Sequence, residues 1–93
     1  MAHRVVWSGR ALADVDDTAS YIAKDSSSYA RTVVRNILAS TRSLSTFPRS
    51  GRIVPEFEDE NVREIFAYSY RVIYRVEADE VVVAAVIHGK RML

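Results

Sequence analysis

The last third of this chain gathers side chains that bind anions around one that can carry a proton. It reads VREIFAYSYRVIYRVEADEVVVAAVIHGKRML, and near its end Gly89 is flanked by His88, Lys90 and Arg91. A guanidinium or ammonium group holds a phosphate or a carboxylate by charge-assisted hydrogen bonds, and an imidazole titrates near neutral pH. These residue types are compatible with an enzyme, a binding module, or both. The candidates are Arg63, Arg71, His88, Lys90 and Arg91.

Composition narrows the class of protein. The 93 residues carry 13 Lys and Arg against 12 Asp and Glu, a formal net charge of +1. A protein that binds nucleic acid mainly through phosphates usually has a larger positive excess, so the charge argues against a free-standing nucleic-acid binder. The lack of cysteine excludes disulfides, thiol catalysis and zinc–thiolate sites. We expect one domain over residues 1–93, with no cofactor and no metal.

No stretch of the sequence has the apolar length of a signal peptide or of a membrane span. We therefore expect a cytoplasmic protein that has no membrane partner. Hydrophobic residues make up 48% and charged residues 27%, which is an ordinary globular balance and indicates a folded chain.

A short strand and a helix are expected at the start of the chain. The run HRVVW is β-branched and aromatic, which predicts a strand over residues 3–7. Ser8 is the candidate N-cap of a helix that ends near Ala23. Apolar residues recur along this helix at the spacing of one face, at Leu12, Val15, Ala19 and Ile22.

A second helix follows the break KDSSS. Ser27 or Ser28 can cap it, and it runs to about Thr46, before Pro48 ends the helical pattern. Its buried stripe is expected at Ala30, Val33, Ile37, Thr41 and Leu44. We interpret a neighbouring flank as solvated, and its residues are Arg31, Arg35 and Arg42.

Three strands are expected in the second half, over residues 62–67, 70–77 and 80–88. The turns between them are short enough to make consecutive antiparallel hairpins. The segment GRIVPEFEDEN before them reads as a loop, in which Arg52 is a candidate ion-pair partner of Glu56 and residues 56–60 form an acidic, solvated run. Two amphipathic helices on one face of this sheet make a two-layer α+β domain, with an N-terminal strand, a two-helix hairpin and a three-stranded antiparallel meander. The pattern does not place the first strand in the sheet.

The middle and last strands of the meander distribute their apolar residues differently. Side chains of the middle strand alternate, with Tyr70, Val72, Tyr74 and Val76 on one face and Arg71, Ile73 and Arg75 on the other. We interpret the two tyrosines as core-facing aromatics with solvated hydroxyls. The last strand, VVVAAVI, is apolar on both faces and is expected inside the sheet. The arginine-bearing face of its neighbour is then expected to be partly left for a partner.

Four segments together resemble the RelE/ParE superfamily, the toxin halves of type II toxin–antitoxin pairs. They are SGRALADVDDTASYIA after the first strand, LSTFPRSGRIVPE, VREIFAYSYRVIYRV and VVVAAVIHGKR, in the family's order and spacing from about Val5 to Arg91. The superfamily carries two activities on one fold. RelE-type members are ribosome-dependent endonucleases that cut mRNA, whereas ParE-type members act on DNA gyrase and block replication.

The resemblance to RelE-type enzymes implies roles for three arginines. Metal-free RNA cleavage by this class uses the ribose 2′-hydroxyl as nucleophile and needs a base, an acid and cations around the developing charge. Strand by strand, Arg63 matches the first lysine position, Arg71 the second-strand arginine and Arg91 the arginine after the last strand. The chain departs from that pattern at Ile65, where a second lysine is expected, and at Leu93, where it ends without a tyrosine.

His88 keeps the endonuclease hypothesis open, since it could move the proton that the missing groups would carry. The catalytic residues would then be His88, Arg71 and Arg91. The simpler interpretation is that His88 caps its strand and hydrogen-bonds locally, and that Glu64 is a surface ion-pair partner and no base. The missing lysine and tyrosine, the balanced charge and the ending VIHGKR favour the ParE-type activity. In that activity the target-binding residues would be Arg63, Arg71, Lys90 and Arg91.

The same resemblance implies the partners. A ParE-type toxin would bind DNA gyrase, a RelE-type toxin would bind the ribosome and mRNA, and a cognate antitoxin would neutralise either one. An inert member that binds only its antitoxin is a third hypothesis. The antitoxin groove is expected between the two helices and the sheet edge, as in similar toxins, in a toxin homodimer or a toxin–antitoxin hetero-oligomer.

Overall fold

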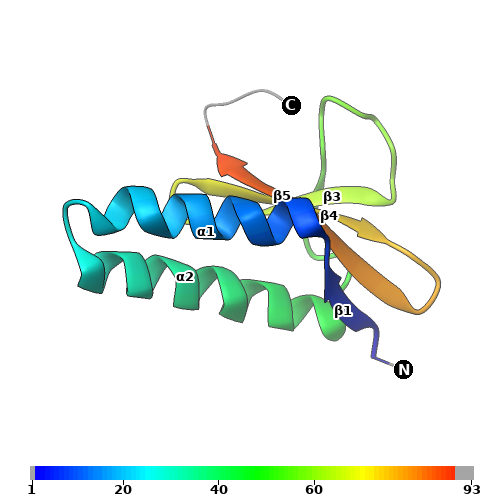
Figure 1. Cartoon of the computed structure of the whole chain (residues 1–93). Helices are drawn as coiled ribbons and strands as arrows, with labels where there is room; N and C mark the ends of the chain where they lie inside the picture. The colour runs from blue at the N-terminus through cyan, green and yellow to red at the C-terminus, as the bar shows by residue number, and fades with distance from the viewer. Residues whose placement is uncertain (1, 90–93) are drawn as a thin grey trace.

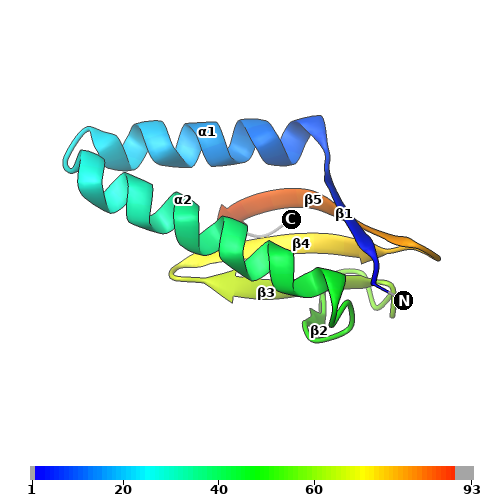
Figure 2. The same ribbon diagram turned by 90° about the horizontal axis from the view of Figure 1, so that it is seen from below.

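The computed structural model describes residues 2–89, which form a five-stranded sheet with two helices on one face (Figures 1 and 2). The strands lie in the order β1-β5-β4-β3-β2, with β1 parallel to β5 and every other pair antiparallel. This is the two-layer α+β architecture that the sequence predicts. The elements are β1 (Arg4–Trp7), α1 (Gly9–Ala23), α2 (Ser27–Arg42), the 3₁₀ helix η1 (Ser43–Ser45), β2 (Arg52–Ile53), β3 (Val62–Ala67), β4 (Tyr70–Val76) and β5 (Glu80–His88).

The first strand completes one edge of the sheet, a position that the sequence pattern left open. Arg4 of β1 lies opposite Glu80 of β5, and Trp7 lies opposite Val83. β5 therefore has a neighbour on each side over its first half, which confirms that it is an interior strand. The crossover from β1 to β5 carries both helices to the same face (Figure 2).

The second half of β5 extends past the end of β1, because β1 has four residues and β5 has nine. Along this second half, the side chains of Ser8 and Asp14 bind backbone groups of β5 that a longer β1 would have bound. The Ser8 hydroxyl donates to the Ala84 carbonyl at 3.1 Å, and the Asp14 carboxylate accepts from the Val86 N–H at 2.9 Å. These two bonds satisfy backbone groups that would otherwise form an open sheet edge.

Both helices bury the faces that their apolar spacing predicts, with one exception. All the expected buried positions of α2 and η1 are buried, namely Ala30, Val33, Ile37, Thr41 and Leu44. From α1, Ala11, Val15 and Ile22 pack against the same core. Leu12 was expected on that stripe, but its side chain is 56% exposed.

The helix ends differ from the sequence prediction by a few residues. Ser8 caps α1 as predicted, but α2 is capped by Ser26 and not by Ser27 or Ser28. Serine suits this position because its hydroxyl accepts an N–H of the first turn. The α-helix ends at Arg42 and continues as η1, so the helical path tightens before Thr46. No helix within residues 2–89 is long and apolar enough to cross a membrane.

A bulge in β5 changes which of its side chains face the helices. Ile73 of β4 lies opposite Ala85, but the next residue, Tyr74, lies opposite Val83, so Ala84 is an extra residue. An extra residue reverses the alternation of side chains. Val83 and Val86 consequently both pack in the core under the helices.

We call the face of the sheet away from the helices the far face. The loop before β3 covers part of it and contains β2, a two-residue strand that the sequence did not predict. Val54 of this loop packs in a second apolar cluster with Val62, Ile73, Ala85 and Ile87. Part of the far face is therefore buried by the protein itself.

Candidate functional site

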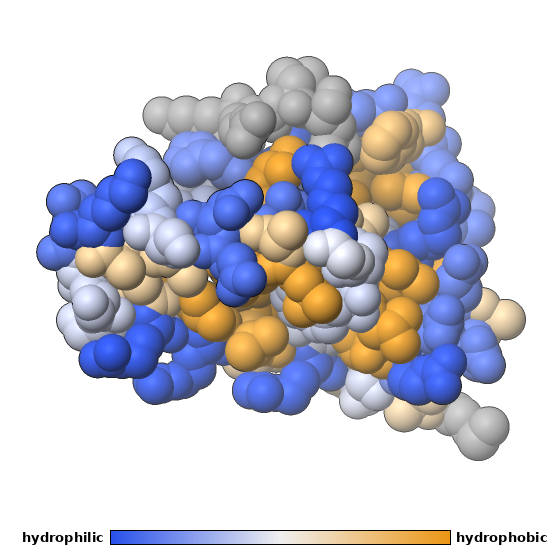
Figure 3. Space-filling model, viewed as in Figure 1, coloured by the Kyte–Doolittle hydropathy of each residue, from blue (hydrophilic) through white to orange (hydrophobic). Residues whose placement is uncertain are grey.

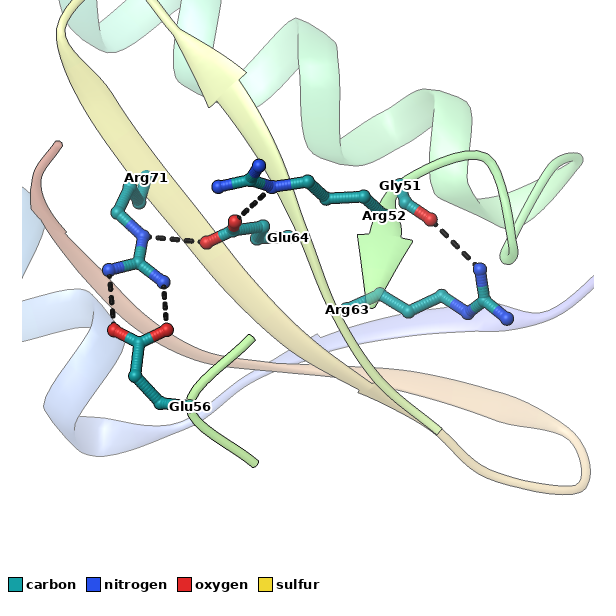
Figure 4. Close-up of polar contacts among 6 residues, drawn as sticks. All are labelled: Gly51, Arg52, Glu56, Arg63, Glu64 and Arg71. Atoms are coloured by element: carbon teal, nitrogen blue, oxygen red, sulfur yellow. Dashed lines mark hydrogen bonds and ion pairs between the residues drawn. The ribbon is translucent and has the colours of Figure 1, made fainter. Parts of the chain in front are cut away.

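Arg71 lies on the far face, and acidic residues of the protein take up its charge. Its side chain is only 6% exposed. Nε donates to Glu64 at 2.6 Å, while Nη1 and Nη2 each donate to Glu56 at 2.9 Å (Figure 4). The bonds to Glu56 raise the pKa of Arg71 and outweigh the opposing effect of burial. The prediction that the arginine-bearing face of β4 is left for a partner is wrong at this residue.

Glu64 is the centre of a larger arrangement. Its side chain is fully buried, and its other oxygen accepts from Nε of Arg52. The Arg52 guanidinium also lies over the ring of Phe66, 5.5 Å from the centroid. We call Arg52, Glu56, Glu64 and Arg71 the ionic cluster, in which two cations and two carboxylates give a formal charge of zero.

The ionic cluster changes three sequence interpretations. Glu64 is an ion-pair partner, as predicted, but it is buried and not at the surface. Arg52 pairs with Glu64 in place of Glu56. Glu56 is bound to Arg71 and so does not belong to a freely solvated acidic run.

Arg63 points to the other side of the sheet. It is the strand neighbour of Glu64, and consecutive side chains of a strand point to opposite faces. Its Nη1 donates to the Gly51 carbonyl at 2.9 Å (Figure 4), and its Nε donates to the Glu60 carbonyl, also at 2.9 Å. Arg63 and Arg71 therefore do not converge on one surface, which contradicts the expectation of a shared anion clamp.

A second arginine, Arg49, lies beside Arg63. Its Nη1 donates to the same Glu60 carbonyl at 3.3 Å, and its Nη2 donates to the Asn61 side chain at 3.0 Å. The Nη1 of Arg63 also donates a weaker hydrogen bond to the Arg49 carbonyl at 3.4 Å. We call Arg49 and Arg63 the edge arginine pair. Among residues 2–89, no carboxylate forms an ion pair with either of them.

Tyr74 supports the turn that carries this pair. Its side chain is fully buried, and its hydroxyl accepts the Gly51 N–H at 3.0 Å. Burial raises the pKa of Tyr74, against smaller opposing effects of that bond and of Arg63. Tyr74 faces the core as predicted, but its hydroxyl is bonded to the protein and is not solvated.

His88 lies on the helix side of the sheet. It is opposite Tyr70, and the two rings meet edge to face with centroids 5.7 Å apart. Since Tyr70 and Arg71 are strand neighbours, His88 and Arg71 lie on opposite faces. His88 instead lines a pocket with α1, next to Asp14 and Asp17.

The proposed catalytic set is therefore not assembled by the residues that the structure describes. A general acid or base must lie within hydrogen-bond reach of the reacting group that the cations hold. His88 and Arg71 fail that condition because the sheet separates them, and Lys90 and Arg91 lie outside the described residues. No group of His, Asp and Glu among residues 2–89 could hold a metal ion.

A mostly apolar groove with a volume of about 570 Å³ lies between the two helices. Figure 3 shows hydrophobic residues gathered between α1 and α2 on this face of the molecule. Small and branched side chains line the groove, and its rim carries two cations. The lining residues include Ala19, Ala23, Ala30, Val34 and Leu38, with Arg31 and Arg35 on the rim.

Sequence reasoning missed the partners of the arginines, although one signal was available. The short turn after β3 sets the register of the hairpin, which places Glu64 opposite Ile73 and Arg71 opposite Phe66. Glu64 and Arg71 are then diagonal neighbours on one face, close enough for long side chains to meet. No comparable signal marks Arg49, because its contacts depend on how the loop folds back on β3.

Comparisons with known proteins agree with this architecture. Residues 5–93 match the family model described as the ParE toxin of the type II toxin–antitoxin system, parDE. No curated protein matches the chain.

Solved structures share the fold at low sequence identity. A chain of the chromosomal ParDE toxin–antitoxin system from P. aeruginosa is 20% identical with a TM-score of 0.77, covering 94% of this chain and 96% of that one. A chain of the RelBE2 toxin–antitoxin complex from Mycobacterium tuberculosis is 18% identical with a TM-score of 0.67, covering 95% and 99%. The YoeB dimer from Staphylococcus aureus is 13% identical with a TM-score of 0.65, covering 95% and 98%.

Proposed function

This chain belongs to the ParE toxin family of type II toxin–antitoxin systems, and we propose that it inhibits growth by binding DNA gyrase, with no chemical step of its own. In this proposal the toxin acts as a binding module, and its surface cations and apolar groups recognise protein. The alternative is a ribosome-dependent mRNA endonuclease that uses His88, Arg71 and Arg91.

The observation that carries the proposal is that Arg71 is buried and bound by carboxylates of the protein. An endonuclease needs this cation to stabilise negative charge on the phosphate as it develops. Here the guanidinium is already bound by Glu64 and Glu56 and is almost inaccessible. His88, on the opposite face, could not act on a group held at Arg71. Both facts favour target binding over RNA cleavage.

The antitoxin is proposed to dock in the groove between α1 and α2. An amphipathic helix fits such a groove by inserting its apolar face, with residues three and four apart as anchors. Arg31 and Arg35 on the rim would pair with acidic residues that flank those anchors. The complex is then a toxin–antitoxin hetero-oligomer, whether or not the toxin also forms a homodimer.

The activity test adds purified toxin separately to a gyrase supercoiling assay and to a translating-ribosome mRNA cleavage assay. We expect loss of supercoiling and no cleavage. His88→Ala is the informative variant, because it should inhibit gyrase as well as the original chain does. Ribosome-dependent cleavage that His88→Ala abolishes would instead establish the endonuclease.

The groove is tested by placing a charge in it. Leu38 is 39% exposed and lines the groove, so Leu38→Asp should weaken antitoxin binding about tenfold or more, because a carboxylate would be buried against apolar side chains. Asn36→Asp adds the same charge on an exposed part of α2 outside the groove lining and is the matched control. Equal binding by both variants, measured by calorimetry, would place the antitoxin elsewhere.

A further inference from the structure

The turn between η1 and β2 presents an aromatic ring, Phe47, which lines one surface pocket together with Arg49 of the edge arginine pair. Phe47 is 64% exposed, although an apolar ring of this size is usually buried. Arg49 is exposed in the same turn, and Arg63 reaches it from β3 through the carbonyls of Gly51 and Arg49. An exposed aromatic beside arginines is the composition that dominates binding energy at protein interfaces.

The two guanidinium groups are held in place before any partner arrives. Both donate to one oxygen, the Glu60 carbonyl, so the cations lie within a few ångströms of each other. Backbone carbonyls fix Arg63 on one side, while its Nη2 makes no hydrogen bond within residues 2–89 and keeps two N–H donors available. Groups fixed in advance lose little conformational entropy on binding, which increases affinity.

No carboxylate within residues 2–89 forms an ion pair with either arginine of this pair. Two like charges at such a short separation repel each other, and carbonyl oxygens carry only partial negative charge. The other two arginines near β3 differ, because Arg52 and Arg71 meet carboxylates in the ionic cluster. A bound carboxylate would lie between Arg49 and Arg63 and remove their repulsion.

We propose that Phe47, Arg49 and Arg63 form the target-binding surface of this toxin, and that they recognise carboxylates next to an apolar side chain on an acidic protein segment. The inference rests on the proposed function, which makes the target a protein. It adds to that function a location separate from the antitoxin groove, and a residue, Arg49, that no pattern in the sequence indicates.

The neighbouring charges favour an acidic protein over nucleic acid. Glu58, Asp59 and Glu60 are exposed in the loop that holds the edge arginine pair. A nucleic-acid backbone carries a phosphate at every nucleotide and would bring several of them close to these carboxylates. A protein segment can place one or two carboxylates at the arginines and an apolar side chain on Phe47.

The test compares variants of the proposed target-binding surface with a variant that removes an arginine from another part of the sheet. Arg49→Gln, the double variant Arg49→Gln with Arg63→Gln, and Phe47→Ser are compared with Arg75→Gln, which removes an exposed arginine on β4. The readouts are growth arrest on expression without antitoxin and the toxin concentration for half-inhibition of gyrase. We expect that concentration to rise about tenfold for Arg49→Gln and further for the double variant, with Arg75→Gln unchanged.

Each outcome bears on a separate claim. Full growth arrest by Arg49→Gln and Phe47→Ser, both exposed positions that tolerate substitution, would overturn the inference even if the double variant fails to fold. If the original chain leaves gyrase active, the proposed target is wrong, but loss of growth arrest in Arg49→Gln alone would still support this surface. Binding of single-stranded DNA or RNA oligonucleotides that depends on Arg49, measured by fluorescence anisotropy, would overturn the acidic-protein partner.

Discussion

The ionic cluster and the edge arginine pair each contain two arginines near β3, but the arginines have different partners. Arg71 and Arg52 meet the carboxylates of Glu64 and Glu56, so the far face carries no net charge at this point. Arg63 and Arg49 meet carbonyl and amide oxygens and form no ion pair within residues 2–89. Figure 4 shows the bond from Arg63 to the Gly51 carbonyl. A cation paired inside the protein stabilises the fold, whereas one held by neutral oxygens is ready for an external anion.

A match to a sequence motif does not determine what an arginine does in the folded protein. Aligned by strand, Arg63 and Arg71 look equivalent as anion-binding residues. Their surroundings give them opposite roles, because a fully buried glutamate lies next to one and a carbonyl-lined turn lies next to the other. The role of an arginine is therefore decided by the groups that reach it from other segments.

The largest effect is expected from breaking the ionic cluster. Arg71→Met keeps most of the side-chain volume but leaves the Glu64 carboxylate buried with one partner fewer. Removing one member of a buried ion pair costs about 3–5 kcal/mol of unfolding free energy. Urea denaturation followed by circular dichroism measures this loss. A cost below about 1 kcal/mol would mean that the ionic cluster contributes no more to stability than an exposed ion pair does. The ionic cluster and the edge arginine pair would then not differ in their effect on the fold.

A smaller effect is expected from disturbing the turn under the edge arginine pair. An added Cβ at residue 51 would press against the Glu64 carbonyl oxygen and would lie 2.7 Å from the Tyr74 hydroxyl. Because a backbone atom cannot move aside easily, Gly51→Ala should cost about 1–3 kcal/mol. Gly9→Ala is the matched control, since a Cβ there meets no atom. If Gly51→Ala still folds, gyrase inhibition should fall, because a turn shifted by the added Cβ moves the residue 51 carbonyl to which Arg63 donates.

The next effect is a pH-dependent contribution to stability from Tyr74, whose hydroxyl accepts a hydrogen bond from this turn. Tyr74→Phe removes the acceptor of the Gly51 N–H and should cost about 1–2 kcal/mol at pH 8. The folded-state pKa of Tyr74 is raised by burial above its ordinary value of 10.0, so its contribution is complete below pH 10 and is lost as pH rises through the folded-state pKa. The difference in stability between the original chain and Tyr74→Phe should therefore narrow from pH 8 to pH 11. A constant difference would mean that the tyrosine ionises equally in both states.

The smallest effect is expected at an exposed arginine outside both regions. Arg75 lies next to Tyr74 on β4, is exposed and forms no ion pair within residues 2–89. Arg75→Gln should change the unfolding free energy by less than about 0.5 kcal/mol and leave growth arrest intact. Loss of growth arrest in a variant that remains folded would extend the functional surface to the far face.

Local patterns were enough to predict most of the fold. Alternation and short turns set the bounds of β3 and β5, and the capping serine set the start of α1, because each of these depends on residues close in sequence. The two-residue β2 was missed because a strand of that length has no periodicity. The position of β1 was also not predictable, since pairing with a distant strand leaves no mark in a four-residue run.

The candidate site was less predictable than the fold. The sequence identified Arg63, Arg71 and His88, but it treated them as one surface, and the sheet separates Arg71 from the other two. That error has a physical source. Side-chain alternation determines which residues of a single strand share a face, whereas the hairpin register determines which residues of two strands share one.

The parallel pairing of β1 with β5 joins segments 76 residues apart, from Arg4 to Glu80. On the ribosome, the residues of α1 and α2 are synthesised well before those of the interior strand against which they pack. The groove proposed for the antitoxin is lined by residues between 19 and 38, whereas closure of the sheet awaits residues 80–88. The residues of this groove thus leave the ribosome ahead of the strand that completes the sheet, and a chain released early lacks the support for its first helix.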